Sequence, residues 1–170
     1  MLSEKLTKLL SEQITHEYDA AYKYLAMSAA ADGMGLKGIA SWFYSQAKEE
    51  VAHGTHIFQY VLERGAIPTL GHIEQPPAKY ADIQEIFEAG LAHERKVTGL
   101  INNIATAAMQ AHDHACYNFM MWFVNEQVEE EASFSEILDK LKLMEDNKGM
   151  LFALDNELGT RVFVNPFPNQ

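Results

Sequence analysis

Cysteine and long apolar runs are scarce in this sequence. The single cysteine, Cys116, cannot form an intramolecular disulfide, nor can it supply the paired thiolates of a zinc ribbon or a rubredoxin-type iron centre. This scarcity is typical of a reducing compartment, so we expect a cytoplasmic protein. No apolar window approaches the length of a membrane span, and the N-terminus becomes charged and amphipathic at once, so we expect no membrane segment.

Basic residues are also few. The chain has 13 Lys and Arg against 24 Asp and Glu, which gives a formal net charge of -11. Nucleic acids and anionic membranes favour basic patches, so neither is an expected partner. Cations are the natural ligands of such a chain. Its 170 residues fit one domain, which can bury a hydrophobic core without disulfides.

Glycine and proline are concentrated in a few short segments, and the sequence between them has helical periodicity. Asp82 followed by Glu85 is typical of a capping box, and Gly65 with Pro68 marks a helix end. We therefore predict an all-α fold that forms one domain over residues 1–170. Its expected helices are four long ones and a short C-terminal one, at 4–32, 36–64, 82–110, 114–146 and 149–158.

The connections between these helices indicate the topology. Turns of a few residues join the first helix to the second and the third to the fourth, so each pair should be an antiparallel hairpin. The segment 65–81 could extend to roughly 55 Å, whereas each long helix spans about 42 Å. It can therefore run the length of the bundle and leave the second and third helices parallel. The prediction is a four-helix bundle with one long crossover.

One glutamate interrupts the apolar stripe of each long helix near its middle. In the second helix a histidine follows three residues later, on the same face. Burying four carboxylates without partners would cost roughly several kcal/mol for each group. A bound pair of cations removes this cost. A ligand set of carboxylates with one imidazole nitrogen is typical of iron or manganese, whereas a tetrahedral zinc site would use thiolates. The predicted metal ligands are Glu17, Glu50, His53, Glu94 and Glu130.

The ferritin-like di-iron bundles carry a glutamate on each of two helices and Glu-x-x-His on each of the other two. Here Glu17 and Glu94 fill the single positions, and Glu50 with His53 forms one motif. The fourth helix instead has Gln127-x-x-Glu130, so the second metal should bind more loosely. Over essentially the whole chain, the sequence resembles the non-haem bacterial ferritins.

The resemblance implies roles for individual residues. Glu50 would bridge two iron ions, with Glu17 and His53 on the first ion and Glu94 and Glu130 on the second, close to Gln127. A third iron site would involve Glu49, Glu126 and Glu129, with Glu130 shared. Tyr24 and Trp122 match aromatic residues near the centre that are thought to donate electrons.

The resemblance also implies a function. Twenty-four subunits would form a hollow shell, in which dioxygen or hydrogen peroxide oxidises Fe(II) and ferric mineral accumulates. Haem is not expected, because Val51 stands where bacterioferritins have their haem-binding methionine and the histidine of the fourth helix is absent. Two alternatives are a di-iron or di-manganese oxidase acting on an organic substrate and a non-catalytic metal-binding bundle. The remaining histidines are expected at the surface: His16, His56, His72, His93, His112 and His114.

Overall fold

A computed structural model describes residues 1–77, 79–144 and 147–167 of the chain. Within these residues the chain forms helices and no strand, which confirms the all-α prediction. None of the helices in these ranges is long and apolar enough to cross a membrane. Residues 145–146, which we expected to end the fourth helix, lie outside the described residues. The helices of the described part are α1 (Glu4–Gly33), α2 (Lys37–Glu63), α3 (Ile83–Gln110), α4 (His114–Met144) and α5 (Lys148–Leu158).

Local capping accounts for several helix ends. The Ser3 hydroxyl accepts a hydrogen bond from the Leu6 amide at the start of α1, and the Asp82 carboxylate accepts one from the Glu85 amide at 2.9 Å. Both contacts satisfy amides that have no partner within the helix. Gly65 follows α2 with φ of 73°, a backbone conformation that glycine adopts without steric cost. The predicted cap and stop signals are thus confirmed.

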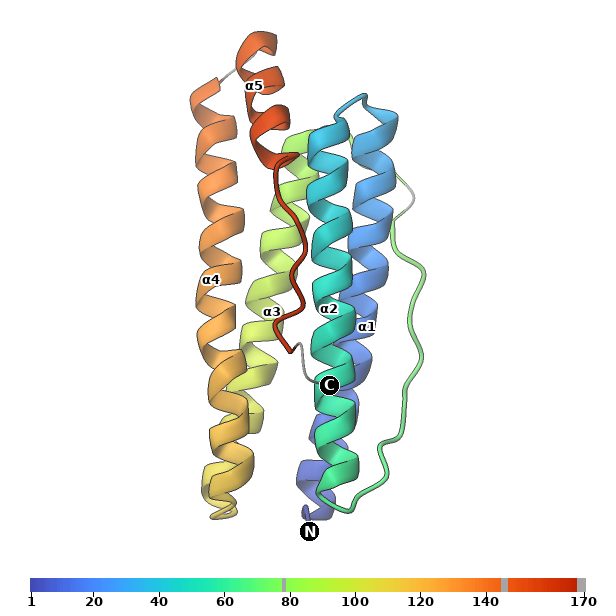
Figure 1. Ribbon diagram of the computed structural model, residues 1–170, viewed down its shortest axis with the longest axis vertical. Helices are drawn as coiled ribbons and strands as arrows, with labels where there is room; N and C mark the ends of the chain where they lie inside the picture. Colours follow the sequence, from blue (N-terminus) through green and yellow to red (C-terminus); the bar gives the residue numbers. More distant parts are fainter. Residues whose placement is uncertain (78, 145–146, 168–170) are drawn as a thin grey trace.

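The crossover between α2 and α3 runs along the outside of the bundle beside α1 (Figure 1). Side chains of α1 hold it there: the Ser11 hydroxyl accepts from the Thr69 amide at 3.1 Å, and the Thr15 hydroxyl accepts from the Gly71 amide at 2.8 Å. The hairpins α1–α2 and α3–α4 are antiparallel, whereas α2 and α3 run parallel (Figure 1). The predicted ferritin-like topology with one long crossover is confirmed.

The apolar core consists of two clusters, one toward each end of the bundle. One cluster contains Tyr24, Phe43 and Phe134, and the other contains Leu10 and Phe123. The stripe glutamates fall between the two clusters in every long helix. Helical spacing therefore places a polar layer across the middle of the bundle, between two apolar layers that exclude water.

The short helix α5 packs against the start of α2. The Asp155 carboxylate accepts a hydrogen bond from the Ile39 amide at 2.8 Å and so caps α2 across the interface. Gly38 permits this approach, because a Cβ atom built there would lie 1.7 Å from the Asp155 carbonyl oxygen. We expected α5 to pack on the bundle end or on a neighbouring subunit. Leu154 and Leu158 are buried on the bundle end, while Met150 is 43% exposed.

Gly38→Ala is expected to displace α5, because the added methyl group meets backbone rather than a movable side chain. Overpacking of this kind lowers the free energy of unfolding by about 1–3 kcal/mol. Thermal unfolding measures the change. Gly99→Ala is the matched control, since nothing lies within 4 Å of a Cβ atom there; alanine in that helix should leave stability equal or higher. Equal melting temperatures for the two variants would contradict the close packing at Gly38.

Candidate metal centre

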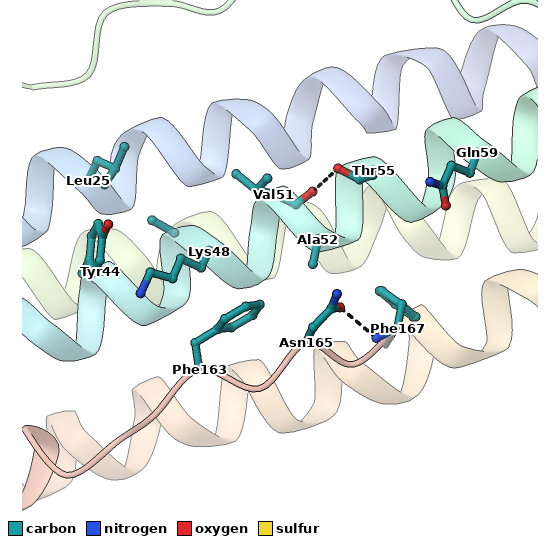
Figure 2. A pocket seen from close by; sticks show the side chains of 11 residues that line it. Leu25, Tyr44, Lys48, Val51, Ala52, Thr55, Gln59, Phe163, Asn165 and Phe167 are labelled. Atoms are coloured by element: carbon teal, nitrogen blue, oxygen red, sulfur yellow. Dashed lines mark hydrogen bonds between the residues drawn. The ribbon is translucent and has the colours of Figure 1, made fainter. Parts of the chain in front are cut away.

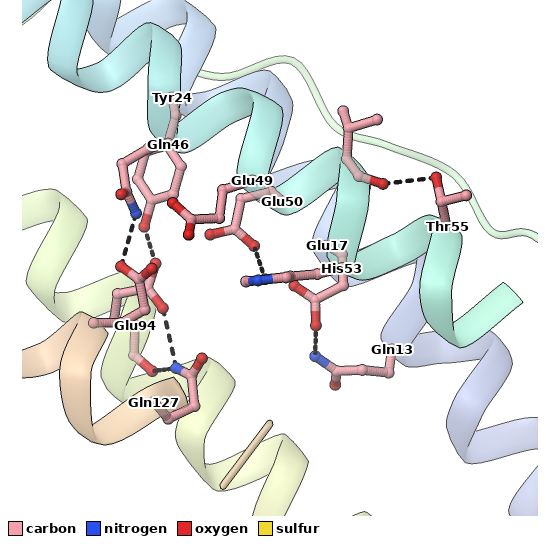
Figure 3. Close-up of polar contacts among 12 residues, drawn as sticks. Gln13, Glu17, Tyr24, Gln46, Glu49, Glu50, His53, Thr55, Glu94 and Gln127 are labelled. Carbon is pink, nitrogen blue, oxygen red and sulfur yellow. Dashed lines mark hydrogen bonds and ion pairs between the residues drawn. The ribbon is translucent and has the colours of Figure 1, made fainter. Parts of the chain in front are cut away.

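Glu17, Glu50 and His53 form one potential metal-binding group inside the bundle. Each offers a ligand atom, and the three atoms lie within 4.8 Å of one another. The Glu50 carboxylate lies 3.3 Å from His53 Nδ1, as expected for residues three apart on one helix. Figure 3 shows the three side chains pointing toward one another. All three are at least 97% buried, so the group can hold an ion away from bulk water.

Glu94 and Glu130 lie in the same polar layer but outside that close group. Two glutamine amides position them: Gln127 Nε2 donates to Glu94 Oε2 at 3.0 Å, and Gln46 Nε2 donates to Glu130 Oε2 at 2.7 Å. The Tyr24 hydroxyl also donates to the Glu94 carboxylate (Figure 3). Gln127 is therefore directed at the Glu94 carboxylate. Here it acts as a hydrogen-bond donor to Glu94.

Sequence reasoning gave no role to two of the glutamines near the site. Gln46 lies on the predicted inward stripe of α2 and contacts Glu130. Gln13 donates to Glu17 at 2.8 Å from one helical turn earlier. A glutamine four residues before a predicted buried glutamate is the signal that could have identified Gln13. An amide donor holds a carboxylate without adding charge, so these contacts orient the two carboxylates.

Burial dominates the electrostatics of the centre. Desolvation raises the pKa of Glu17 to about 7, and it raises the pKa of Glu94 as well. The pKa values of Glu50 and Glu130 lie well above the ordinary range, first through desolvation and then through the charge of Glu94. Burial lowers the pKa of His53 to about 3. The metal-free site thus favours protonated carboxyls and a neutral imidazole, and that imidazole is already in its metal-binding form.

A second group of possible ligands shares His53. Ligand atoms of Glu49, His53 and Glu126 also lie within 4.8 Å of one another. Burial, together with the neighbouring charges of Glu49 and Glu129, raises the pKa of Glu126 to about 7. Glu129 is exposed and lies near this group without belonging to it. Of the residues predicted for a third site, Glu49 and Glu126 belong to this close group together with His53, whereas Glu129 and Glu130 do not.

The aromatic residues predicted near the centre lie beside the ligands. Tyr24 is fully buried between Glu94 and the rings of Phe43 and Phe134. Desolvation raises its pKa well above 10, so the hydroxyl keeps its proton and can donate it in a hydrogen bond. Trp122 meets His53 edge-on, with ring centroids 5.4 Å apart.

The surface assignment of His93 was wrong. Its side chain is only 9% exposed, because Lys23 lies over it, with Nζ 3.4 Å from Nδ1, and the edge of Tyr24 packs against it. His56 is partly buried too, since Phe167 stacks on it. Lys23, Tyr24 and Phe167 all lie far in sequence from the histidines that they contact. Only the tertiary packing reveals this burial.

This chain is similar to known proteins over almost its whole length. Residues 7–144 match the family model of the ferritin-like domain. The chain is 39% identical to a bacterial non-heme ferritin of Staphylococcus aureus over 163 residues, which cover 96% of this chain and 98% of that protein. It is also 39% identical to a probable bacterial non-heme ferritin-like protein of Haemophilus influenzae over 160 residues, covering 94% and 96% of the two chains.

Solved structures agree with the sequence relatives. A structure described as a novel open pore ferritin from the hyperthermophilic archaeon Archaeoglobus fulgidus superposes with a TM-score of 0.94 at 41% identity, and the match covers 95% of this chain and 100% of the other. A humanized archaeal ferritin gives a TM-score of 0.95 at 41% identity over 96% and 99% of the chains. The predicted resemblance is confirmed: this chain belongs to the ferritin family.

Proposed function

We propose that this chain stores iron as a ferritin, oxidising Fe(II) to Fe(III) and depositing ferric mineral inside a 24-subunit cage. The observation that carries the proposal is the set of four buried carboxylates and one neutral histidine between two apolar layers. Membership of the ferritin family identifies iron as the ion that this set of ligands binds. Dioxygen or hydrogen peroxide as oxidant and a cytoplasmic location belong to the same proposal.

The proposed ligands divide into a strong half and a weak half. Glu17, Glu50 and His53 bind the first Fe(II), because their ligand atoms already lie within 4.8 Å of one another. Glu50 bridges to a second Fe(II) held by Glu94 and Glu130. Two adjacent ions can each give one electron to a shared oxidant, and the buried carboxylates offset the positive charge that develops on oxidation.

The weak half favours turnover over retention. Gln127 offers a neutral amide where a charged or imidazole ligand would bind more strongly, and its nitrogen faces Glu94. A product ion held by few strong ligands leaves more readily. We propose that Glu49, Glu126 and Glu129, with Glu130 shared, form a third iron site that receives such ions; Glu49 and Glu126 also belong to the group in which His53 takes part.

Haem binding and oxidation of an organic substrate both have less support. Val51 is 45% exposed at the position where a haem-binding methionine would stand. An organic substrate would need an apolar pocket beside the metals. An apolar groove of about 500 Å³ is lined by Val51, Thr55 and Phe163, but none of the proposed carboxylate ligands lines it (Figure 2). The Tyr24 and Trp122 rings, by contrast, fit a redox role beside iron.

One experiment tests the proposal directly. The purified protein receives several hundred Fe(II) per 24 subunits in air, and ferric absorbance and soluble iron are followed together with the particle size. The expected result is oxidation faster than in a protein-free control, with iron retained on a particle of cage size. Iron that precipitates at the control rate, or a stable monomer or dimer in size exclusion, would refute the storage function.

The metal-free protein should lose stability as pH rises, through Glu17. Its folded pKa of about 7 lies above the ordinary pKa of 4.5 for an exposed glutamate, so the folded state binds more protons than the unfolded state between these values. The stabilising contribution is therefore full below about pH 4.5 and is lost as pH rises through about 7. Glu17→Gln should show a smaller decrease of melting temperature from pH 5 to pH 8 than wild type. The same slope in both proteins would contradict the raised pKa.

A further inference from the structure

The C-terminal segment, residues 159–167, turns back from α5 and runs over the face between α2 and α4 (Figure 1). Arg161 anchors its first part through an ion pair with Glu49 at 2.5 Å, and its guanidinium lies 4.9 Å from the centre of the Trp42 ring. Phe167 anchors the other end by stacking on His56, with ring centroids 3.8 Å apart. The segment is therefore held by specific contacts at two points.

Arg161 lies directly over an acidic group that can bind a metal ion. Ligand atoms of Glu49, His53 and Glu126 lie within 4.8 Å of one another. His53 is 98% buried, and within the described part of the chain its Nε2 has no hydrogen-bond partner. A buried imidazole that has an unpartnered nitrogen and is grouped with two carboxylates is suited to a bound cation. Arg161 is the one Lys or Arg residue of the segment 159–167.

The charge of Arg161 reaches beyond its direct partner. It opposes the desolvation that raises the pKa of Glu49, and it acts in the same direction on Glu126 and Glu130. Its side chain is only 28% exposed and that of Glu49 17%, so solvent screens this pair less than a fully exposed one. A single positive charge supplied by the chain itself thus partly neutralises the acidic face.

We propose that Arg161 is an internal counter-ion of the third site, and that a metal ion binding to the Glu49 and Glu126 carboxylates of that site must displace it. The inference rests on the proposed function for the origin of the ion. A guanidinium carries one charge, whereas Fe(II) carries two and Fe(III) three, so the exchange favours the more highly charged ion. Arg161 must be displaced by either ion, so it lowers the affinity of the third site for both, and at low concentration only the ion that the carboxylates bind more strongly, Fe(III), overcomes this competition.

Displacement has a structural consequence that can be measured. When Arg161 leaves Glu49, its guanidinium also leaves the face of Trp42. Loss of this cation–π contact changes the surroundings of an indole that is only 5% exposed. In a Trp122→Phe background, which removes the tryptophan beside His53, binding of an ion at the third site should therefore alter the emission of Trp42, and the alteration should be lost when Arg161 is also replaced.

The test compares binding of Tb(III), a redox-inert trivalent probe, to wild type and Arg161→Gln. The variant should bind Tb(III) about tenfold more tightly, since the ion no longer competes with a charge-assisted hydrogen bond. Arg95→Gln is the matched control: it removes one positive charge from the exposed pair with Glu131 at 3.7 Å, and its affinity should stay within about twofold of wild type, as for a weak surface pair. In a Glu126→Gln background, Arg161→Gln should change nothing.

Equal Tb(III) affinity for wild type and Arg161→Gln, with both proteins folded to the same melting temperature, would overturn the role of Arg161. An equal gain from Arg95→Gln would overturn it as well, because net charge would then explain the effect. A separate Zn(II) titration reports on the internal carboxylates. If Glu17→Gln leaves Zn(II) stoichiometry unchanged, the proposed ferroxidase centre fails, while the Tb(III) comparison still decides the role of Arg161.

Discussion

Glu50→Gln should reduce the initial rate of Fe(II) oxidation by about 100-fold or more, the largest effect on activity that we expect from a single substitution. Glu50 lies in the close group with Glu17 and His53, and it is the proposed bridge to the second ion. The amide keeps the shape of the side chain but removes its charge. Without the bridge, the two ions lose their shared ligand and no longer transfer electrons to the same oxidant. Stopped-flow absorbance of the first two Fe(II) per subunit measures the rate.

Loss of folding should not account for this effect. Burial and the charges of neighbouring glutamates raise the pKa of Glu50 well above its usual range, so the metal-free fold gains nothing from the ionised form. Glu50→Gln should therefore melt at the wild-type temperature or above when metal is absent. Glu63→Gln, an exposed position at the end of the same helix, is the matched control and should oxidise iron at the wild-type rate. An unchanged initial rate for Glu50→Gln would refute its bridging role.

Phe134→Ala should cause the largest loss of stability, about 3–5 kcal/mol in the free energy of unfolding. The ring is fully buried, and it packs on Trp42 at 5.1 Å, on Tyr24 at 5.8 Å and on Phe87 at 6.1 Å between ring centroids. Removing it leaves a cavity that rigid aromatic neighbours cannot easily fill. Denaturant unfolding of the metal-free protein measures the loss.

Two comparisons make the Phe134 prediction specific. Phe152→Ala removes an equal ring that is 68% exposed, and it should change stability by less than about 0.5 kcal/mol. Gly90→Ala adds a methyl group 2.2 Å from Phe134 Cε1, so it should destabilise the wild type. The same change should cost less in a Phe134→Leu background, where the smaller side chain leaves room. Additive effects of the two substitutions would show that Gly90 and Phe134 are not coupled.

The sequence was sufficient to predict most of the fold. Its stripes of apolar residues have the period of a helix, and glycine and proline mark where they end, so helix bounds follow from local spacing. Predicted bounds differ from those of the structure by at most one residue wherever both are described. The length of the crossover decided the parallel direction of α2 and α3, because a short loop could not have spanned the bundle.

The sequence also placed the proposed iron ligands in one layer. A buried glutamate on an apolar stripe is costly enough to be informative by itself, and four of them at matching heights predict a shared ion. The structure brings Glu17, Glu50 and His53 into ligand distance of one another. It holds Glu94 and Glu130 through Gln127 and Gln46 instead, a difference of side-chain direction that residue spacing does not contain.

Features that depend on distant contacts were decided only by the tertiary structure. Lys23 and His93 lie 70 residues apart, and Arg161 and Glu49 lie 112 residues apart, so no local pattern predicts either pair. Helical periodicity fixes which face of a helix is apolar, but it does not fix what covers the partly polar faces beside that stripe. The layer of buried carboxylates is therefore a property of the sequence. Its covering by the C-terminal segment, with Arg161 on Glu49, follows from how α5 turns the chain back onto the bundle.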